Sequence, residues 1–257
     1  MRPDGTLDSG GTYYWGYHTI NLHGGTLTTS VLPTTYGFNP KIYLTANSTL
    51  EVTGGSDSKS PLMDLGGHTL NINFHNNAWH IFTSLSTNGN IVATGSGVMN
   101  FYKDSAITCP TVAFDIGEGV RFHVDCPSIV MGDLIVRTSN VTYSGSHAVM
   151  VKGRFTPVTQ YFPRVQLHDG ATLDLSGREG TWPVESLVSA CSLSFAANAT
   201  VTVSVGGRQN VPSRLVSWTS IPAGADTLTL LYDDLGAKLE VRADGIYRKR
   251  GLMIIVQ

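Results

Sequence analysis

Apolar and polar positions along this chain repeat one short phrase: an apolar anchor, a bend rich in Gly, Asn or Ser, and a second apolar residue that opens an alternating strand. The clearest copy is N-L-H-G-G-T-L-T-T-S at residues 21–30. By subtraction, eight anchors lie 22, 21, 20, 29, 21, 32 and 28 residues apart. A unit of about 20 residues is typical of stacked repeat proteins. The pairs are Leu22 and Leu27, Leu44 and Leu50, Leu65 and Leu70, Leu85 and Ile91, Phe114 and Val120, Ile135 and Val141, Leu167 and Leu173, and Phe195 and Val201.

Period-two alternation after the bends predicts strands. Leu70, Ile72 and Phe74 illustrate it: side chains at i and i+2 share a face, so the apolar row points inward and a Thr, Asn, Asp or Ser row points outward. No segment carries a sustained helical stripe, so we expect an all-β protein. The bends fall at Gly24–Gly25, Asn47–Ser48, Gly66–Gly67, Asn88–Gly89, Asp169–Gly170 and Asn198–Ala199, residue types that tolerate tight turns.

Strand, bend and strand at this pitch predict the coils of a β-solenoid, each coil covering the apolar row of its neighbour. A β-sandwich also fits short alternating strands. The repeated phrase favours the solenoid, because successive strands of a sandwich occupy different environments. We assign residues 18–208 to the solenoid, 1–17 to a lead-in or N-terminal cap, and 209–257 to a β-hairpin cap that covers the open end.

The C-terminal cap and the irregular spacings give more local expectations. Asp244–Gly245 predicts a two-residue type I′ hairpin loop. Leu252–Val256 fits a buried closing strand, or an edge through which the chain self-associates. The wide spacings at 85–114 and 135–167 predict loops that leave the solenoid, among them the aromatic segment Phe155–Pro163.

Composition points outside the cytosol. Charged residues make up 14% of the 257 residues, against roughly 25% in average soluble domains. The net charge of −2 argues against nucleic acid as a partner. No apolar run approaches the roughly 20 residues of a membrane helix, so no membrane-spanning segment is expected. Residues 1–5 are not followed by an apolar segment, so an exported form would be a fragment whose leader has been removed.

Three cysteines, Cys109, Cys126 and Cys191, cannot all pair within one chain. The 17-residue separation of the first two positions allows a disulfide across neighbouring coils, but buried free thiols are the preferred interpretation. No paired Cys and His spacing supports zinc, and no dinucleotide or phosphate-binding motif is present. We therefore assign no metal and no cofactor.

The phrases L-H-G-G-T-L-T-T at residues 22–29 and L-G-G-H-T-L-N-I-N at residues 65–73 resemble the autotransporter-associated β-strand repeats in passenger regions of secreted bacterial proteins. The segments 214–218, 227–230 and 239–247 resemble the closing part that follows such repeats. This resemblance covers residues 18–75 and 164–250. It implies a right-handed parallel β-helix displayed outside the cell, and it supplies no catalytic residues.

The segment 73–80 is the first candidate ligand site. Trp79 would stack on a sugar ring, while neighbouring amides and imidazoles bind hydroxyls. The alternative is a turn whose Trp79 folds onto the core and whose Asn side chains satisfy the bend, and this interpretation is preferred. The candidate residues are His75, Asn76, Asn77, Trp79 and His80.

A second candidate is the strand face formed by Arg121, His123 and Asp125, where a polysaccharide lyase would need a proton-abstracting base. The alternative is the ordinary polar outward row of a solenoid strand. The carboxylates of Asp174 and of Asp233–Asp234 suit a glycosidase pair poorly. We assign no catalytic residue.

The sequence thus predicts a noncatalytic, secreted or bacterial cell-surface β-solenoid that acts as a structural stalk or adhesin. Its partner would be an extracellular glycan or a surface protein. The alternative function is a carbohydrate-active β-helix, either lyase-like or a glycan-binding module. Assays of glycan binding and of glycan cleavage distinguish the structural stalk from the carbohydrate-active β-helix.

Overall fold

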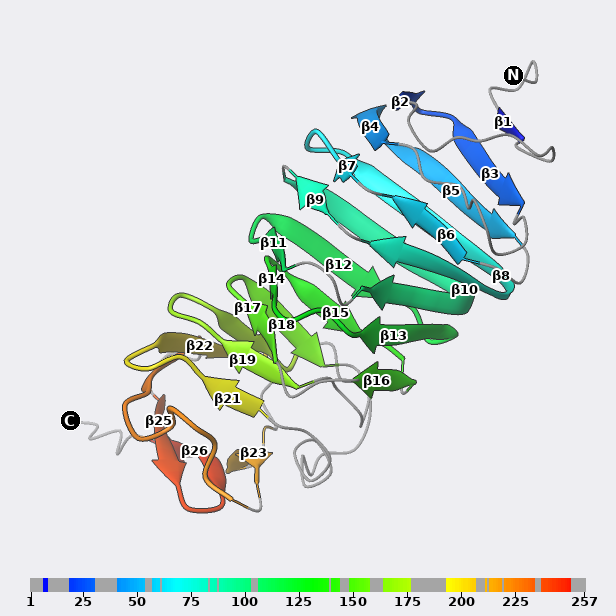
Figure 1. Ribbon diagram of the computed structural model, residues 1–257. Helices are drawn as coiled ribbons and strands as arrows, with labels where there is room; N and C mark the ends of the chain where they lie inside the picture. The colour runs from blue at the N-terminus through cyan, green and yellow to red at the C-terminus, as the bar shows by residue number, and fades with distance from the viewer. Residues whose placement is uncertain are drawn as a thin grey trace.

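A computed structural model describes residues 7–8, 19–30, 41–53, 57–60, 62–82, 84–86, 88–102, 106–138, 140–143, 148–157, 164–176, 193–206, 211, 213–218, 220–233 and 237–250. Throughout these ranges the regular structure is strand, without helix. The strands stack as a parallel β-helix from the N-terminal to the C-terminal end (Figure 1). The all-β solenoid prediction is confirmed, and the sandwich is excluded by the parallel pairing.

One parallel sheet runs the length of the solenoid. It contains 14 strands, and each strand pairs with the strand at the same place in the next coil. Its main path is β1 (Leu7–Asp8), β3 (Thr26–Ser30), β5 (Ser48–Thr53), β8 (Thr69–Phe82), β10 (Gly89–Phe101), β12 (Val112–Ile116), β15 (Leu134–Val136), β18 (Arg154–Pro157), β20 (Thr172–Asp174), β22 (Thr200–Ser204) and β24 (Thr229–Tyr232). Beside this path lie β6 (Asp57–Ser60), β13 (Val120–Val124) and β16 (Val141–Tyr143).

Two further parallel sheets supply the other strand of each coil. The first consists of β2 (Thr19–His23), β4 (Lys41–Ala46), β7 (Leu62–Asp64) and β9 (Leu85–Ser86). The second consists of β11 (Ile107–Cys109), β14 (Ile129–Met131), β17 (Val149–Val151), β19 (Val165–Leu167) and β21 (Leu193–Phe195). Because β9 contacts β11, the second sheet takes over where the first ends. The apolar rows of these sheets face the long sheet across a continuous core.

Register between coils explains why the phrase repeats. Leu70, Ile91, Phe114, Leu134 and Phe155 are aligned on successive strands, and all are buried. Each coil must present an apolar residue at this position, because a polar side chain there would lose its water without gaining a partner. The predicted bends at Gly24–Gly25, Gly66–Gly67, Asp169–Gly170 and Asn198–Ala199 lie between the two strands of one coil, and that prediction is confirmed. At Asn47–Ser48 and Asn88–Gly89 the first residue lies between the strands, whereas Ser48 already belongs to β5 and Gly89 to β10.

Two of the eight pairs were assigned to the wrong bend. Phe114 aligns with Ile91, so Phe114 and Val120 flank the following corner of the coil, between β12 and β13. Ile135 points outward between the buried Leu134 and Val136, and its corner lies between β15 and β16. The true bends of these coils join β11 to β12 and β14 to β15. Both pairs were misleading because each coil here has a second corner flanked by apolar residues.

The wide spacing at 135–167 contains an unpredicted coil, formed by β17 and β18. Phe155, which we expected in a loop, is a fully buried residue of β18 that pairs with Leu134 and Leu173. Residues 158–163 of the same predicted loop lie outside the described residues. The coil was missed because strands of three and four residues contain too few alternating positions to stand out.

The C-terminal end carries an antiparallel sheet of β23 (Arg214–Ser217), β26 (Gly245–Arg250) and β25 (Ala237–Arg242). It is shown in orange and red in Figure 1. The capping hairpin is confirmed, although its loop residues are Ala243 and Asp244, and Gly245 already belongs to β26. Neither loop residue has a positive φ, so the loop is not type I′. Residues 252–256 lie outside the described part of the chain.

Candidate functional site

The first candidate segment, residues 73–80, lies within the single strand β8, which turns a sharp corner there. Asn76 and Asn77 form the corner with φ values of 54° and 57°, a left-handed conformation that Asn tolerates better than most residues. Across the corner, β10 has a single residue, Ser96, whose hydroxyl donates to Asn77 Oδ1 at 3.1 Å. We expected a turn after a strand, and the segment is instead a bend within one.

The corner separates the predicted sugar ligands onto different sides. His75 is exposed, and its Nε2 lies 2.6 Å from Glu51 Oε2 on the preceding coil. His80 points into the core and packs edge-on against Phe82, with 4.7 Å between the ring centroids. Burial lowers the pKa of His80 to about 3, so it is neutral at physiological pH. His80 is therefore a core residue, and the prediction that it binds hydroxyls is wrong.

Trp79 instead meets the second candidate cluster. In the register of β8, β10 and β13, Trp79 lies opposite Val98, and Val98 lies opposite Arg121. The Trp79 ring approaches the His123 imidazole across β10, with 6.2 Å between centroids and an interplanar angle of 53°. Two clusters more than 40 positions apart in the sequence therefore share one outward surface.

We call this surface the Trp79 face. It comprises the outward side chains of the second half of β8, the second half of β10, and β13: Trp79, Ile81, Val98, Asn100, Arg121 and His123. Ile81, Val98 and Asn100 are 7%, 3% and 4% exposed, whereas the other three are partly exposed. The face thus has a closely packed base of buried side chains, with the partly exposed Trp79, Arg121 and His123 around it. Asn100 was not predicted, because nothing in its local sequence distinguishes it.

His123 is held in a fixed environment. Its Nδ1 lies 2.6 Å from Thr142 Oγ1 on β16. Burial lowers its pKa, Asp125 partly opposes that shift, and Arg121 adds to it. His123 is therefore mainly neutral near pH 7. The alternation of Arg121, His123 and Asp125 on one side of the chain is as predicted.

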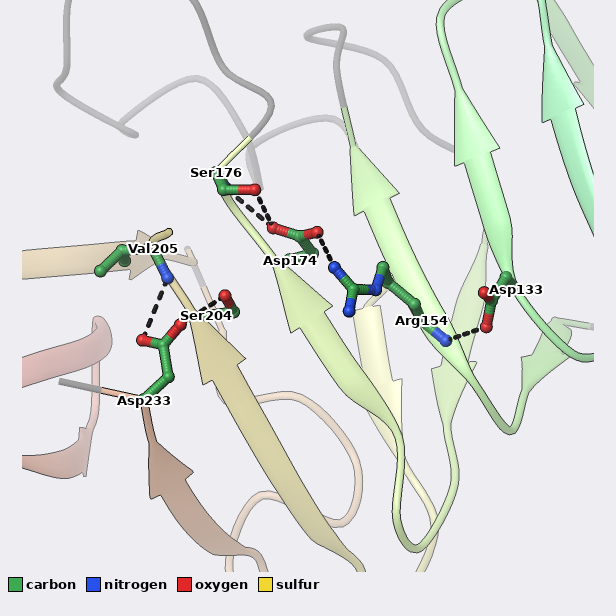
Figure 2. A network of polar contacts seen from close by, with 7 residues as sticks. All are labelled: Asp133, Arg154, Asp174, Ser176, Ser204, Val205 and Asp233. Carbon is green, nitrogen blue, oxygen red and sulfur yellow. Dashed lines mark hydrogen bonds and ion pairs between the residues drawn. The ribbon is translucent and has the colours of Figure 1, made fainter. Parts of the chain in front are cut away.

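The carboxylates weighed as a glycosidase pair belong to a polar network on the outer side of the long sheet. Arg154 Nη1 donates to Asp174 Oδ2 at 2.7 Å, and Ser176 donates to Asp174 Oδ1 through its backbone N and hydroxyl at 2.9 and 2.5 Å. Ser204 Oγ donates to Asp233 Oδ2 at 2.5 Å (Figure 2). Asp234 lies outside the described residues.

This network leaves little freedom for acid–base chemistry. Burial raises the pKa of Asp174, but the hydrogen bonds from Ser176 and the ion pair with Arg154 outweigh it, so the pKa lies below its ordinary value. A glycosidase acid needs the opposite shift. Asp174 therefore joins neighbouring coils and has the wrong electrostatics for a catalytic acid.

An open groove of about 400 Å³ crosses the bends of several coils. Much of its lining is glycine or backbone, because side chains there would collide with the preceding coil: a Cβ on Gly89 would lie 2.6 Å from His68 O. Its charged groups are Lys152 and Asp133, and Asp133 Oδ1 already accepts from Arg154 N at 2.6 Å. The groove follows from close coil packing and was not predicted.

Within the described ranges, Cys109 and Cys126 are buried free thiols, and Cys109 donates to Val130 O at 3.1 Å. The preferred interpretation of these two residues is confirmed, and Cys191 lies outside those ranges. The same ranges contain no group of three or more His, Cys, Asp or Glu side chains placed to hold a metal ion. They also contain no helix long and apolar enough to cross a bilayer.

The chain matches no protein-family model, no curated protein and no solved structure. The parallel β-helix therefore rests on the strand register alone. The resemblance to autotransporter-associated repeats stays a prediction.

Proposed function

We propose that this chain is a noncatalytic segment of a secreted or cell-surface protein, in which the β-solenoid serves as a stalk or adhesin scaffold. The observation that carries this proposal is the use of the outward polar side chains. They bond from coil to coil along the solenoid instead of converging on a cleft. Such ladders stabilise a long repeat protein, whose units contact only their neighbours.

Three examples lie along the long sheet. Asn73 Nδ2 donates to Glu51 Oε1 at 2.7 Å, and Thr94 Oγ1 donates to Asn73 Oδ1 at 2.7 Å, which links three successive strands. Arg137 forms two hydrogen bonds to the carboxylate of Asp115 at 2.8 and 3.0 Å. The Arg154–Asp174 pair continues the series. The carboxylates of Glu51, Asp115 and Asp174 are thus occupied in joining coils.

A turnover assay tests the noncatalytic part. The purified chain is incubated with uronic-acid polymers and with neutral polysaccharides, and reducing ends and unsaturated products are measured. We expect no product above the protein-free blank. Product formation that is lost in Asp174→Asn or His123→Ala would overturn the proposal. Surface display is tested separately, by protease accessibility of the chain on intact cells that express its full reading frame.

A further inference from the structure

The Trp79 face differs from the rest of the solenoid exterior. Elsewhere the long sheet presents mainly polar outward side chains, such as Thr94, whose hydroxyl donates to Asn73 of the preceding coil, and isolated apolar ones, such as Ile135. Here an indole, a guanidinium and an imidazole surround a floor that includes Val98. Because three coils each contribute at least one of these side chains, the arrangement depends on the stacking of coils.

Two polar atoms of this face lack partners. Asn100 Oδ1 and Arg121 Nε are both buried without a hydrogen bond. Asn100 lies on β10, between Ile81 of β8 and His123 of β13. A buried polar atom without a partner destabilises the fold, because it loses its bond to water and gains none, so such atoms call for an explanation. Asn100 Oδ1 needs a hydrogen-bond donor, and Arg121 Nε needs an acceptor.

A sugar satisfies both requirements beside an aromatic ring. Its hydroxyl groups donate and accept, and its C–H faces pack on indole. A carboxylate is the strongest acceptor for a guanidinium, because the hydrogen bond is charge-assisted. His123 is mainly neutral near pH 7 and adds no competing cation.

We propose that the Trp79 face binds a glycan that carries uronic-acid units. Trp79 packs on the sugar ring, Arg121 donates to the carboxylate, and Asn100 accepts from a hydroxyl. No bond is made or broken. The site therefore adds an adhesive contact to the stalk, and its loss would leave the proposed structural role intact.

The test is isothermal titration of the whole chain with oligogalacturonate, with the neutral oligosaccharide of the same backbone, and with dextran sulfate. We expect saturable binding of oligogalacturonate. Trp79→Ala should weaken it at least tenfold. Arg121→Gln should weaken the acidic ligand until it binds no better than the neutral one. Arg137→Gln is the matched control, because Arg137 is also an outward arginine but lies away from the face, and it should bind like the original chain.

Asn100→Leu separates recognition from folding. Removing a buried amide whose oxygen lacks a partner should leave the urea midpoint unchanged or raise it. The same substitution should weaken oligogalacturonate binding at least tenfold. Unchanged affinity in Asn100→Leu or Trp79→Ala, an absence of saturable binding, or equal affinity for dextran sulfate would each overturn the proposal. The last result would reveal simple charge attraction.

Discussion

Replacing Arg154 by Met would remove the positive charge of the Arg154–Asp174 pair and keep most of the aliphatic stem. The carboxylate of Asp174 is 6% exposed, whereas the Arg154 side chain is 54% exposed. Asp174 would keep its two hydrogen bonds from Ser176 and lose the one at 2.7 Å. A buried charged group that loses a partner costs about 1–3 kcal/mol, and solvent around Arg154 reduces this to about 1–2 kcal/mol.

A double-mutant cycle isolates the pair. Arg154→Met, Asp174→Asn and the double variant are unfolded in urea at pH 7, with circular dichroism and Trp fluorescence as probes. We expect a coupling free energy of about 1 kcal/mol. The control is the Arg242–Glu240 pair, whose side chains are 48% and 34% exposed, and its coupling should be clearly weaker because solvent screens it. Equal coupling in the two pairs would refute the reasoning.

Acid should erase the coupling. The pKa of Asp174 is lower in the folded protein than its ordinary value of 3.8. The stabilisation is therefore complete above the unfolded value and is lost as the pH falls through the folded value. A series of cycles at decreasing pH, carried well below 3.8, should give a progressively smaller coupling than at pH 7.

Three further predictions concern the core and its corners. Gly95 has φ +86°, and a Cβ there would lie 2.1 Å from a backbone oxygen of the preceding coil. Gly170 has φ +80° and open space. Gly95→Ala should therefore cost at least about 2 kcal/mol in urea unfolding and Gly170→Ala about 1 kcal/mol, and equal losses would contradict the packing argument. Burial lowers the pKa of His80 from 6.5 to about 3, so stability should fall as the pH drops from about 6.5 toward 3. His80→Phe should flatten this dependence, and an unchanged slope in pH-dependent unfolding would contradict the assignment. Burial raises the pKa of Cys109 to about 12 and that of Cys126 to about 11. In a chain whose third cysteine is replaced by serine, an aromatic disulfide reagent at pH 8 should react rapidly only after unfolding; rapid reaction of the native chain would show that the thiols are accessible.

The solenoid could be predicted because its cause is local and repeated. Leu44 and Leu50, for example, flank one bend, face inward and are buried, and their spacing alone shows this. The coil of β17 and β18 could not be found in the same way. Its buried residues Val149, Val151 and Phe155 fall on two very short strands, so the alternation is brief.

The Trp79 face was only half predictable for a different reason. The alternation of Arg121 and His123 follows from the geometry of one strand. Their approach to Trp79 depends on lateral register between coils, and that register is shifted where β8 has three residues opposite the single Ser96 of β10. A single sequence shows that a bend exists, but it does not show how many residues each coil contributes to that bend. Asn100 becomes notable only once its neighbours on both sides are known.

Because the register of the long sheet is constant, a gene that encodes such a solenoid can gain or lose whole coils. Phe114, Leu134 and Phe155 are aligned on three successive strands, and by subtraction they lie 20 and 21 residues apart. Deleting residues 134–154 would bring Phe155 beside Phe114 with its inward direction preserved, whereas a deletion of half that length would leave a coil incomplete. Unequal recombination in whole coils would therefore lengthen or shorten such a molecule in steps of about 20 residues and keep each remaining interface intact.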